Sequence, residues 1–392
     1  MLRFFCADQP VPTPSVLTAR VHGAGPTGAL AALALADAGW RVQLRDPLPA
    51  HDLCSRSRAY ALTHSSRELL EQLGLWQSLQ AALAPFRRLD LCDRATGQRV
   101  PFLGADLGNG RTEVVGWILE HAPLMQLLLQ AAEAHPLIQL DLGAMADGAQ
   151  EAVDLCVAAD GHHSPTRQAC GIAHWRFPYR QGCLTVQVRL RGSDPDQAWE
   201  LFRPEGPFAV LPLGGDAFQL VWSAPLWRLR ELEQLDGVAF LDALSAALPE
   251  ELQVEVLLDQ PRAFPVALEM AWPLHRGRTV LLGEVAHRCH PVGGQGLNLC
   301  WRDVAELQQL AARCTGGRLS PSRLGRLYTR RRWLDIALVL WATDALVRLF
   351  SNRSPLLLPL RRVALSSLGR FQWLRQLSLR AMSDGPCRLW MP

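Results

Sequence analysis

The feature that most constrains this chain is a glycine pattern near the N-terminus, placed between a strand pattern and a helix pattern. The pattern Gly-x-Gly-x-x-Gly consists of Gly23, Gly25 and Gly28. Residues 16–22 before it predict a strand, an Ala/Leu-rich helix is expected to follow to Ala38, and Asp46 ends a second predicted strand over 41–46. An acid about 20 residues after the glycines completes the fingerprint with which a βαβ unit holds a dinucleotide. A tight turn without a ligand is the weaker alternative.

The composition excludes several classes of protein. The chain has 392 residues, 49% of them hydrophobic, and a formal charge of only +3, so we expect two or three folded domains rather than disorder. All 40 basic residues are arginine, which excludes Schiff-base lysine chemistry, pyridoxal-phosphate anchoring and a Walker A lysine. Ten dispersed cysteines without a C-x-x-C pair, and residues 1–15 without a secretory apolar region, predict a reduced cytoplasmic protein.

Positive charge is concentrated at the C-terminal end. Residues 1–317 carry 26 arginines against 34 acidic residues, whereas residues 318–392 carry 14 arginines against 3 acidic residues. The arginines at 330–332 and 361–362 flank apolar segments, which predicts a basic amphipathic surface. Such a surface fits an anionic membrane, a nucleic acid, an acidic patch of this chain, or solvent alone. No apolar run is long enough to predict a membrane-spanning helix.

The order of predicted elements indicates an α/β domain interrupted by a β-rich domain. Ser65 and Glu68 have capping-box spacing and predict a helix to about Leu83. Residues 184–223 alternate and contain Pro/Gly turns, which is typical of antiparallel sheet. From Leu297 the apolar period is helical. We therefore predict a nucleotide-binding domain (15–85, 112–175 and 275–325), an antiparallel β-sheet domain (86–111 and 176–274) and a C-terminal helical segment (326–392).

Two further motifs are expected to belong to the same site. Asp160-Gly161, in the stretch that runs to Arg167, ends a predicted strand. Gly283-Glu284 is followed by residues 290–298, in which glycines open a long helix. Backbone N–H groups at such a helix start stabilise an anion or an electron-rich ring edge.

With these three motifs the sequence resembles the class A flavoprotein monooxygenases, over nearly the whole chain after residue 15. Within that class it is most similar to the ubiquinone-biosynthesis hydroxylases that act on polyprenylated phenols, of the 2-polyprenyl-6-methoxyphenol hydroxylase type. Segments that carry the narrower resemblance are 58–63, 202–213, 221–223, 290–304 and 342–351. The resemblance implies an α/β, overall α+β, fold: a Rossmann-like FAD-binding domain with an inserted, mainly antiparallel sheet for the substrate and a C-terminal helical segment.

The resemblance also implies a role for each matching position. The three glycines would hold the pyrophosphate of a tightly, non-covalently bound FAD, Asp46 the adenosine ribose, and Arg58 would lie over the pyrophosphate. Asp160 would support binding of the flavin and of NAD(P)H, and Gly283 and Glu284 would lie beside the ribityl chain. The remaining positions would surround the isoalloxazine ring: Pro291, Gly294, Gln295, Gly296, Leu297 and Asn298.

The implied reaction is ring hydroxylation of a polyprenylated phenol in the biosynthesis of ubiquinone, plastoquinone or a related quinone. NAD(P)H would bind transiently as co-substrate and reduce the flavin, O₂ would form a flavin C4a-hydroperoxide, and the phenol ring would take one oxygen atom. The sequence names no catalytic acid or base; His290 is a weak candidate. Glu284 stands where the family has aspartate, and Arg56 stands where the family usually has aspartate.

Other readings of the sequence stay open. A non-catalytic flavin-fold scaffold in a quinone-biosynthesis complex is the alternative to an enzyme. Peripheral contact with the inner face of a membrane suits a lipid-soluble substrate. His287, Cys289 and His290 lie close together, but no second Cys/His pair completes a zinc set, so we expect no metal. No nucleic-acid motif accompanies the basic C-terminal region, so we expect no nucleic-acid partner.

Overall fold

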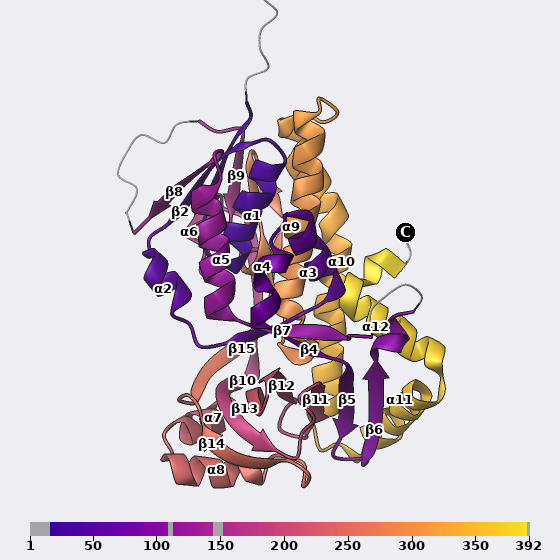
Figure 1. Ribbon diagram of the computed structural model, residues 1–392. Helices are drawn as coiled ribbons and strands as arrows, with labels where there is room; N and C mark the ends of the chain where they lie inside the picture. The colour runs from indigo at the N-terminus through magenta and orange to yellow at the C-terminus, as the bar shows by residue number, and fades with distance from the viewer. Residues whose placement is uncertain (1–15, 109–112, 144–151, 390–392) are drawn as a thin grey trace, which may run out of the picture.

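The computed structural model describes residues 16–108, 113–143 and 152–389, and its upper part in Figure 1 is built on a six-stranded sheet. Neighbouring strands are parallel except for the β16–β17 pair. In spatial order the strands are β16 (His275–Arg276), β17 (Thr279–Leu281), β9 (Leu155–Ala158), β1 (Thr18–His22), β2 (Arg41–Asp46) and β8 (Ile138–Leu142). The predicted βαβ unit is confirmed, because β1 and β2 are parallel neighbours joined by α1 (Pro26–Asp37).

Helix α1 lies at the centre of the upper domain. It packs on both α5 (His121–Ala134) and α9 (Gln295–Thr315), and residues 28–36 are all buried. An Ala/Leu composition suits this position, because small side chains let helices and sheet approach closely. Gly39 follows the last turn with φ +84°, a conformation that glycine adopts most readily. Two short helices, α2 (Ala50–Cys54) and α6 (Pro165–Ala169), follow β2 and β9.

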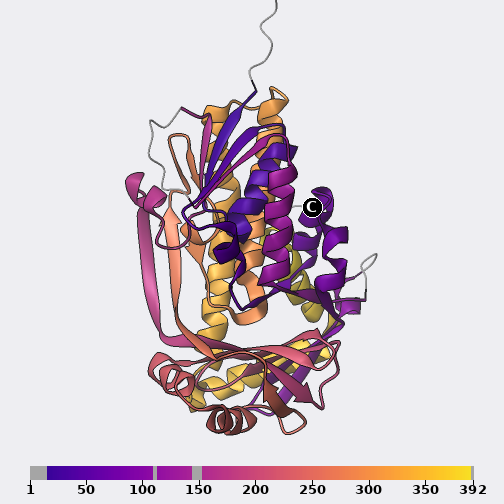
Figure 2. The same ribbon diagram turned by 60° about the vertical axis from the view of Figure 1, so that its left-hand side comes forward.

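The lower part of the molecule in Figure 1 is a nine-stranded, mainly antiparallel sheet. Its path runs β18 (His287–Arg288), β15 (Arg262–Trp272), β10 (Ala173–Arg191), β13 (Ala217–Pro225), β12 (Phe208–Gly214), β11 (Gln197–Phe202), β5 (Arg88–Asp93) and β6 (Gln98–Leu103), with β14 (Gln253–Leu257) paired to β10. Helices α7 (Leu226–Glu233) and α8 (Gly237–Ser245) share a core with it. The long strands β10 and β15 run from this sheet to the upper domain (Figure 2).

A three-stranded sheet, β3 (Ala59–Leu62), β7 (Gly116–Glu120) and β4 (Leu83–Phe86), lies where the two parts meet. Here the structure confirms a helix at Ser65, but the predicted unbroken length to about Leu83 is wrong. Helix α3 (His64–Gln72) has Thr63 at its N-cap, a turn at Gly74 interrupts it, and α4 (Trp76–Leu79) and η1 (Gln80–Ala82) follow. Ser65 does not cap the helix, because its hydroxyl donates to the Ser383 carbonyl oxygen.

The C-terminal region is helical, as predicted. It comprises α10 (Pro321–Phe350), η5 (Pro355–Leu357), α11 (Leu358–Arg370), α12 (Gln372–Asp384) and η6 (Pro386–Leu389). Helix α10 packs along α9 and reaches from the upper domain to the lower sheet (Figures 1 and 2). None of the helices in the described part of the chain is both long enough and apolar enough to span a bilayer. The predicted α/β fold with an inserted antiparallel sheet is confirmed.

Two arginines that we predicted on the basic surface are buried. Arg332 forms ion pairs with Asp303 and Asp335, and Arg361 is fully buried against the C-terminal end of α10. The sequence pattern could not separate these from their exposed neighbours, because the burial of each arginine depends on a contact with another helix: Arg332 with Asp303 of α9, and Arg361 with the end of α10. The predictions for residues 1–15, including Cys6, lie outside the described residues; the nine described cysteines are free thiols.

Candidate functional site

The glycine motif forms a close turn between β1 and α1. The Gly23 N–H donates to the Arg45 carbonyl oxygen at 2.7 Å, and Gly23 has φ +95°. A Cβ on Gly23 would overlap the backbone at Ala159, and one on Gly28 would overlap the Gly23 carbonyl oxygen. A Cβ on Gly25 would meet nothing within 4 Å. Two of the glycines are thus required by packing, and the third leaves the backbone at the start of α1 open to a ligand.

Asp46 lies beside this turn, as predicted. One carboxylate oxygen accepts from the Ala24 N–H at 2.7 Å, and the other accepts from the Leu48 N–H at 2.9 Å. The carboxylate therefore fixes the glycine turn relative to the end of β2. This is the edge of the parallel sheet at which nucleotides bind in folds of this type.

The Asp160-Gly161 motif follows β9 and adjoins the glycine turn through Gly23. The carboxylate of Asp160 accepts from the Ser164 hydroxyl and from the Thr166 N–H, so it fixes the start of α6. The buried guanidinium of Arg167 donates to the carbonyl oxygens of His162 and Val285 at 3.0 and 2.9 Å. Arg167 thereby joins the second motif to the third, a role that we did not assign from sequence.

The third motif places uncapped backbone amides at the start of α9. Gly293 and Gly294, in η4 (Val292–Gly294), have φ +69° and +63°, and within the described residues no side chain caps the helix. Asn298 is fully buried: its amide nitrogen donates to Ala61 and Gly294 carbonyl oxygens, and its oxygen accepts from Thr63 and Ser66. The side chain of Asn298 thus holds the helix start in place.

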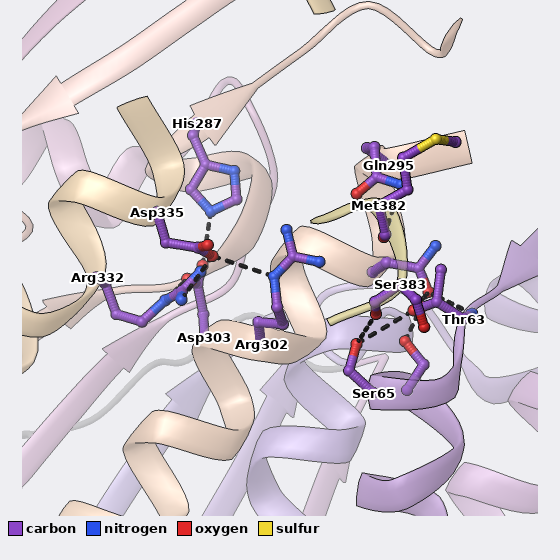
Figure 3. A network of polar contacts seen from close by, with 12 residues as sticks. Thr63, Ser65, His287, Gln295, Arg302, Asp303, Arg332, Asp335, Met382 and Ser383 are labelled. Carbon is purple, nitrogen blue, oxygen red and sulfur yellow. Dashed lines mark hydrogen bonds and ion pairs between the residues drawn. The ribbon is translucent and has the colours of Figure 1, made fainter. Parts of the chain in front are cut away.

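A second network holds Gly283 and Glu284, in η3 (Gly283–Val285). The carboxylate of Asp303 accepts from the Gly283 N–H at 3.1 Å, from His287 Nε2 at 2.6 Å and from Arg332 Nε at 2.7 Å. Burial alone would raise the pKa of Asp303, but the hydrogen bonds and charge interactions with His287 and Arg332 lower it to about 2. Figure 3 shows Arg332 and Arg302 converging on Asp335 in the same network.

The end of α12 closes the site, which sequence reasoning missed. Gln295 Nε2 donates to the Met382 carbonyl oxygen at 3.1 Å, and the Ser65 hydroxyl donates to that of Ser383 at 2.6 Å (Figure 3). Leu379, Met382 and Ser383 line the same cavity as the start of α9. No local signal in the sequence could have indicated a contact between segments more than 80 residues apart.

These elements enclose a cavity of about 810 Å³, within the size range of small-molecule and cofactor sites. The predicted site residues that line it are Arg58, Asp160, Glu284, Pro291, Gly294, Gln295, Gly296, Leu297 and Asn298. The glycine turn, Asp46 and Gly283 lie outside this lining, although Gly23 adjoins Asp160. The structure therefore brings the second and third motifs together and leaves the first at one edge.

The residues present fit a bound flavin nucleotide. Arg58 lines the cavity, and its buried Nε has no hydrogen-bond partner among the described residues. The uncapped amides of α9 and the open backbone at Gly25 are suited to negatively charged groups. Glu284 and Arg56, the two departures from the family pattern, are exposed where they line the cavity, so their longer side chains disturb no buried packing.

His290 is not among the residues that line the cavity. Its ring is fully buried, Nδ1 accepts from the Val292 N–H at 3.2 Å, and Tyr179 packs against it edge-on. Burial lowers the pKa of His290 to about 4, so the ring is neutral at physiological pH. A proton-transfer role for His290 has no support in this geometry.

Glu200 is a lining residue that sequence reasoning missed. Its carboxylate comes from β11 and accepts from the Gly293 N–H at 3.3 Å. Burial raises the pKa of Glu200 to about 7. The available signal was a carboxylate in the middle of the otherwise apolar strand segment Ala198–Phe202.

Comparison with known proteins identifies the family to which the chain belongs. A family model described as an FAD binding domain matches residues 16–143 and 141–340. The chain is 30% identical to 3-demethoxyubiquinol 3-hydroxylase of Escherichia coli, over 92% of this chain and 96% of that protein. It is 28% identical to the human ubiquinone biosynthesis monooxygenase COQ6, over 77% of each. Klebsiella pneumoniae HpxO, solved with FAD and uric acid, matches with a TM-score of 0.74 at 18% identity, over 97% of this chain and all of that chain.

Proposed function

Because the chain belongs to the FAD-dependent monooxygenases that share this FAD binding domain, we propose that it hydroxylates the ring of a polyprenylated phenol. The quinone made would be ubiquinone, or a related prenylated quinone such as plastoquinone. NAD(P)H would serve as the transient electron donor. The E. coli relative is named 3-demethoxyubiquinol 3-hydroxylase, and this name supports a prenylated phenol as the substrate class.

The observation that carries the proposal is one cavity with two chemically different walls. One wall consists of the uncapped backbone amides at the start of α9, together with Arg58 and Asp160. The other is the inner face of the antiparallel sheet, where Ala209, Leu211 and Val221 are apolar. A flavin ring on the first wall would therefore face an aromatic ring on the second.

FAD, when bound, would accept electrons from NAD(P)H and activate dioxygen. The chain's own residues position and protect this chemistry. The N-terminus of α9 stabilises negative charge near Gly294 and Gly296. The apolar sheet face, together with Leu379 of α12, excludes water from the space beside it.

Two measurements on the purified full chain test this function. The visible absorption spectrum should show oxidised flavin at about one per chain, and a prenylated phenol should stimulate NAD(P)H oxidation with a hydroxylated product. The same prenylated ring without its hydroxyl is the matched control and should not be hydroxylated. A chain that takes up no added FAD, or a flavin-loaded chain that is inert toward every prenylated phenol, would support the scaffold alternative.

The same proposal includes contact with the cytoplasmic face of an anionic membrane, from which a lipid-soluble phenol would enter. Leu356, Leu360 and Val363 stand at i, i+4 and i+7 along η5 and α11, and are 86%, 53% and 63% exposed. The exposed arginines Arg353 and Arg362 lie among them. Apolar side chains beside arginines favour the interface of a negatively charged bilayer.

Flotation with lipid vesicles tests this contact. We expect the chain to float with phosphatidylglycerol vesicles, less with phosphatidylcholine vesicles, and less at high salt. The double variant L360E/V363E should lose flotation, whereas V238E, at a 73% exposed position on α8, should keep it. A chain that stays in the soluble fraction with anionic vesicles at low salt would contradict the proposed contact.

A further inference from the structure

Glu200 occupies the middle of the sheet face that borders the cavity. In the register of the sheet, Glu200 pairs with Ala209 on β12 and Leu91 on β5, and Ala209 pairs with Val221 on β13. The row across the sheet is thus apolar on both sides of one carboxylate. A buried acid in such a row carries a desolvation cost, which a sequence selected for packing alone would avoid.

The Glu200 carboxylate also touches the opposite wall of the cavity. It accepts from the Gly293 N–H at 3.3 Å. Gly293 belongs to the loop that precedes α9, where the flavin ring would lie. Glu200 therefore stands between the place of the flavin ring and the sheet face that would hold the phenol.

We propose that Glu200 is the catalytic base that accepts the proton of the substrate's ring hydroxyl. In this step the phenolic O–H bond breaks, its electron pair stays on the phenolate oxygen, and the proton moves to the Glu200 carboxylate and afterwards to solvent. The phenolate so formed has an electron-rich ring carbon, which is what ring hydroxylation requires. The inference rests on the proposed function and adds the residue that activates the substrate.

The surroundings of Glu200 suit a base that works near neutral pH. Burial raises its pKa to about 7, with the Gly293 N–H acting in the opposite direction. The Cys183 thiol on β10 lies near Glu200, and burial raises the pKa of this thiol to about 12, so that it is uncharged. The elements packed beside Glu200 present Ala209, Leu91 and the Gly293 amide, none of which carries charge.

Glu200→Gln in the FAD-loaded full chain tests the inference, with Glu255→Gln on the exposed strand β14 as the matched control. A glutamine oxygen can still accept from Gly293 but cannot take a proton. We expect both variants to keep their flavin spectrum. With the prenylated phenol, E200Q should lose roughly 100-fold or more in kcat with a much smaller change in KM, and E255Q should lose nothing.

A second substrate separates a base from a merely structural residue. The nitro-substituted analogue of the same phenol is already ionised in mildly alkaline buffer and needs no base. We expect E200Q to lose less than about threefold with it, because the missing step is bypassed. Equal losses with the two substrates, or no loss with either, would overturn the inference.

An equilibrium measurement tests the same contact without turnover. The visible absorption of bound 4-nitrophenol reports its ionisation, and the Glu200 carboxylate disfavours a second negative charge beside it. The bound phenol should therefore ionise at least about one pH unit lower in E200Q than in the unsubstituted chain. An unchanged transition, or no binding of 4-nitrophenol to the unsubstituted chain, contradicts the role of Glu200. Turnover of the prenylated phenol alongside that result would leave the proposed function standing.

Discussion

The side-chain amide of Asn298 donates a hydrogen bond of 2.7 Å to the backbone carbonyl oxygen of Ala61, and this contact ties the start of α9 to β3. The two residues are 237 positions apart in the chain. The same side chain accepts from the Thr63 N–H, so one amide group satisfies backbone groups of two elements. The geometry of the cavity wall therefore depends on Asn298, whose side-chain amide is hydrogen-bonded within the protein.

Replacing Asn298 by alanine should destabilise the protein and weaken FAD binding together. The buried Ser66 hydroxyl and the half-buried Ala61 carbonyl and Thr63 amide would lose their partner, so we expect a loss of about 2–4 kcal/mol in the free energy of unfolding. Urea titration measures that loss, and the visible spectrum measures retained flavin. Q309A, at an exposed position on the same helix, should change stability by less than about 0.5 kcal/mol. Equal stability of N298A and Q309A would contradict this account.

The glycine turn predicts a contrast between two alanine variants. G28A should fail to fold or lose much of its stability, because its Cβ would overlap the Gly23 carbonyl oxygen. G25A should keep its melting temperature within a few degrees, because its Cβ meets no protein atom within 4 Å, while its affinity for FAD falls. Thermal unfolding of the flavin-free protein and fluorescence titration with FAD measure the two effects. A G25A variant with unchanged FAD affinity would place the pyrophosphate elsewhere.

The free energy of unfolding should decrease as the pH rises, because of Glu200. Its pKa is about 7 in the folded protein and near 4.5 when unfolded, so below 4.5 both states bind the proton and no cost arises. Between pH 4.5 and 7 the unfolded state binds fewer protons, and the folded state loses about 3 kcal/mol of stability across that window. Urea titrations of the flavin-free protein at pH 5 and 8 should show this difference, relative to E200Q, in which it is absent. A difference in the free energy of unfolding between the two proteins that stays constant from pH 5 to pH 8 would contradict the raised pKa of Glu200.

Substitution of the adjacent residues Arg361 and Arg362 should change the free energy of unfolding by different amounts. Arg361 is fully buried and donates to the carbonyl oxygens of Leu349 and Asn352, which end α10. R361A would leave these acceptors without their partner and should cost about 2–4 kcal/mol in the free energy of unfolding. The exposed neighbour gives the matched control: R362A should cost less than about 0.5 kcal/mol and instead reduce flotation with anionic vesicles. Equal destabilisation by the two variants would contradict the burial difference.

The dinucleotide-binding half of the site could be predicted from the sequence, because its signals are local. The three glycines lie close in sequence to the strand before them and to the acid after them. The role of each depends on local backbone geometry. A helix does begin at this point, but the capping role predicted for Ser65 was wrong for the complementary reason. Its capping signal was local, but the Ser65 hydroxyl is used by Ser383, at the far end of the chain.

The sequence by itself determined the class of fold and the motifs that would hold FAD, because periodicity and turn chemistry act over short stretches of chain. Only the tertiary structure decided that Glu200 meets Gly293, that His290 lies behind the cavity wall, and that α12 closes the site. It also decided which arginines are buried, since Arg361 and Arg362 are alike in sequence and opposite in environment. These outcomes depend on contacts between distant segments, and such contacts exist only once the sheets and helices have packed.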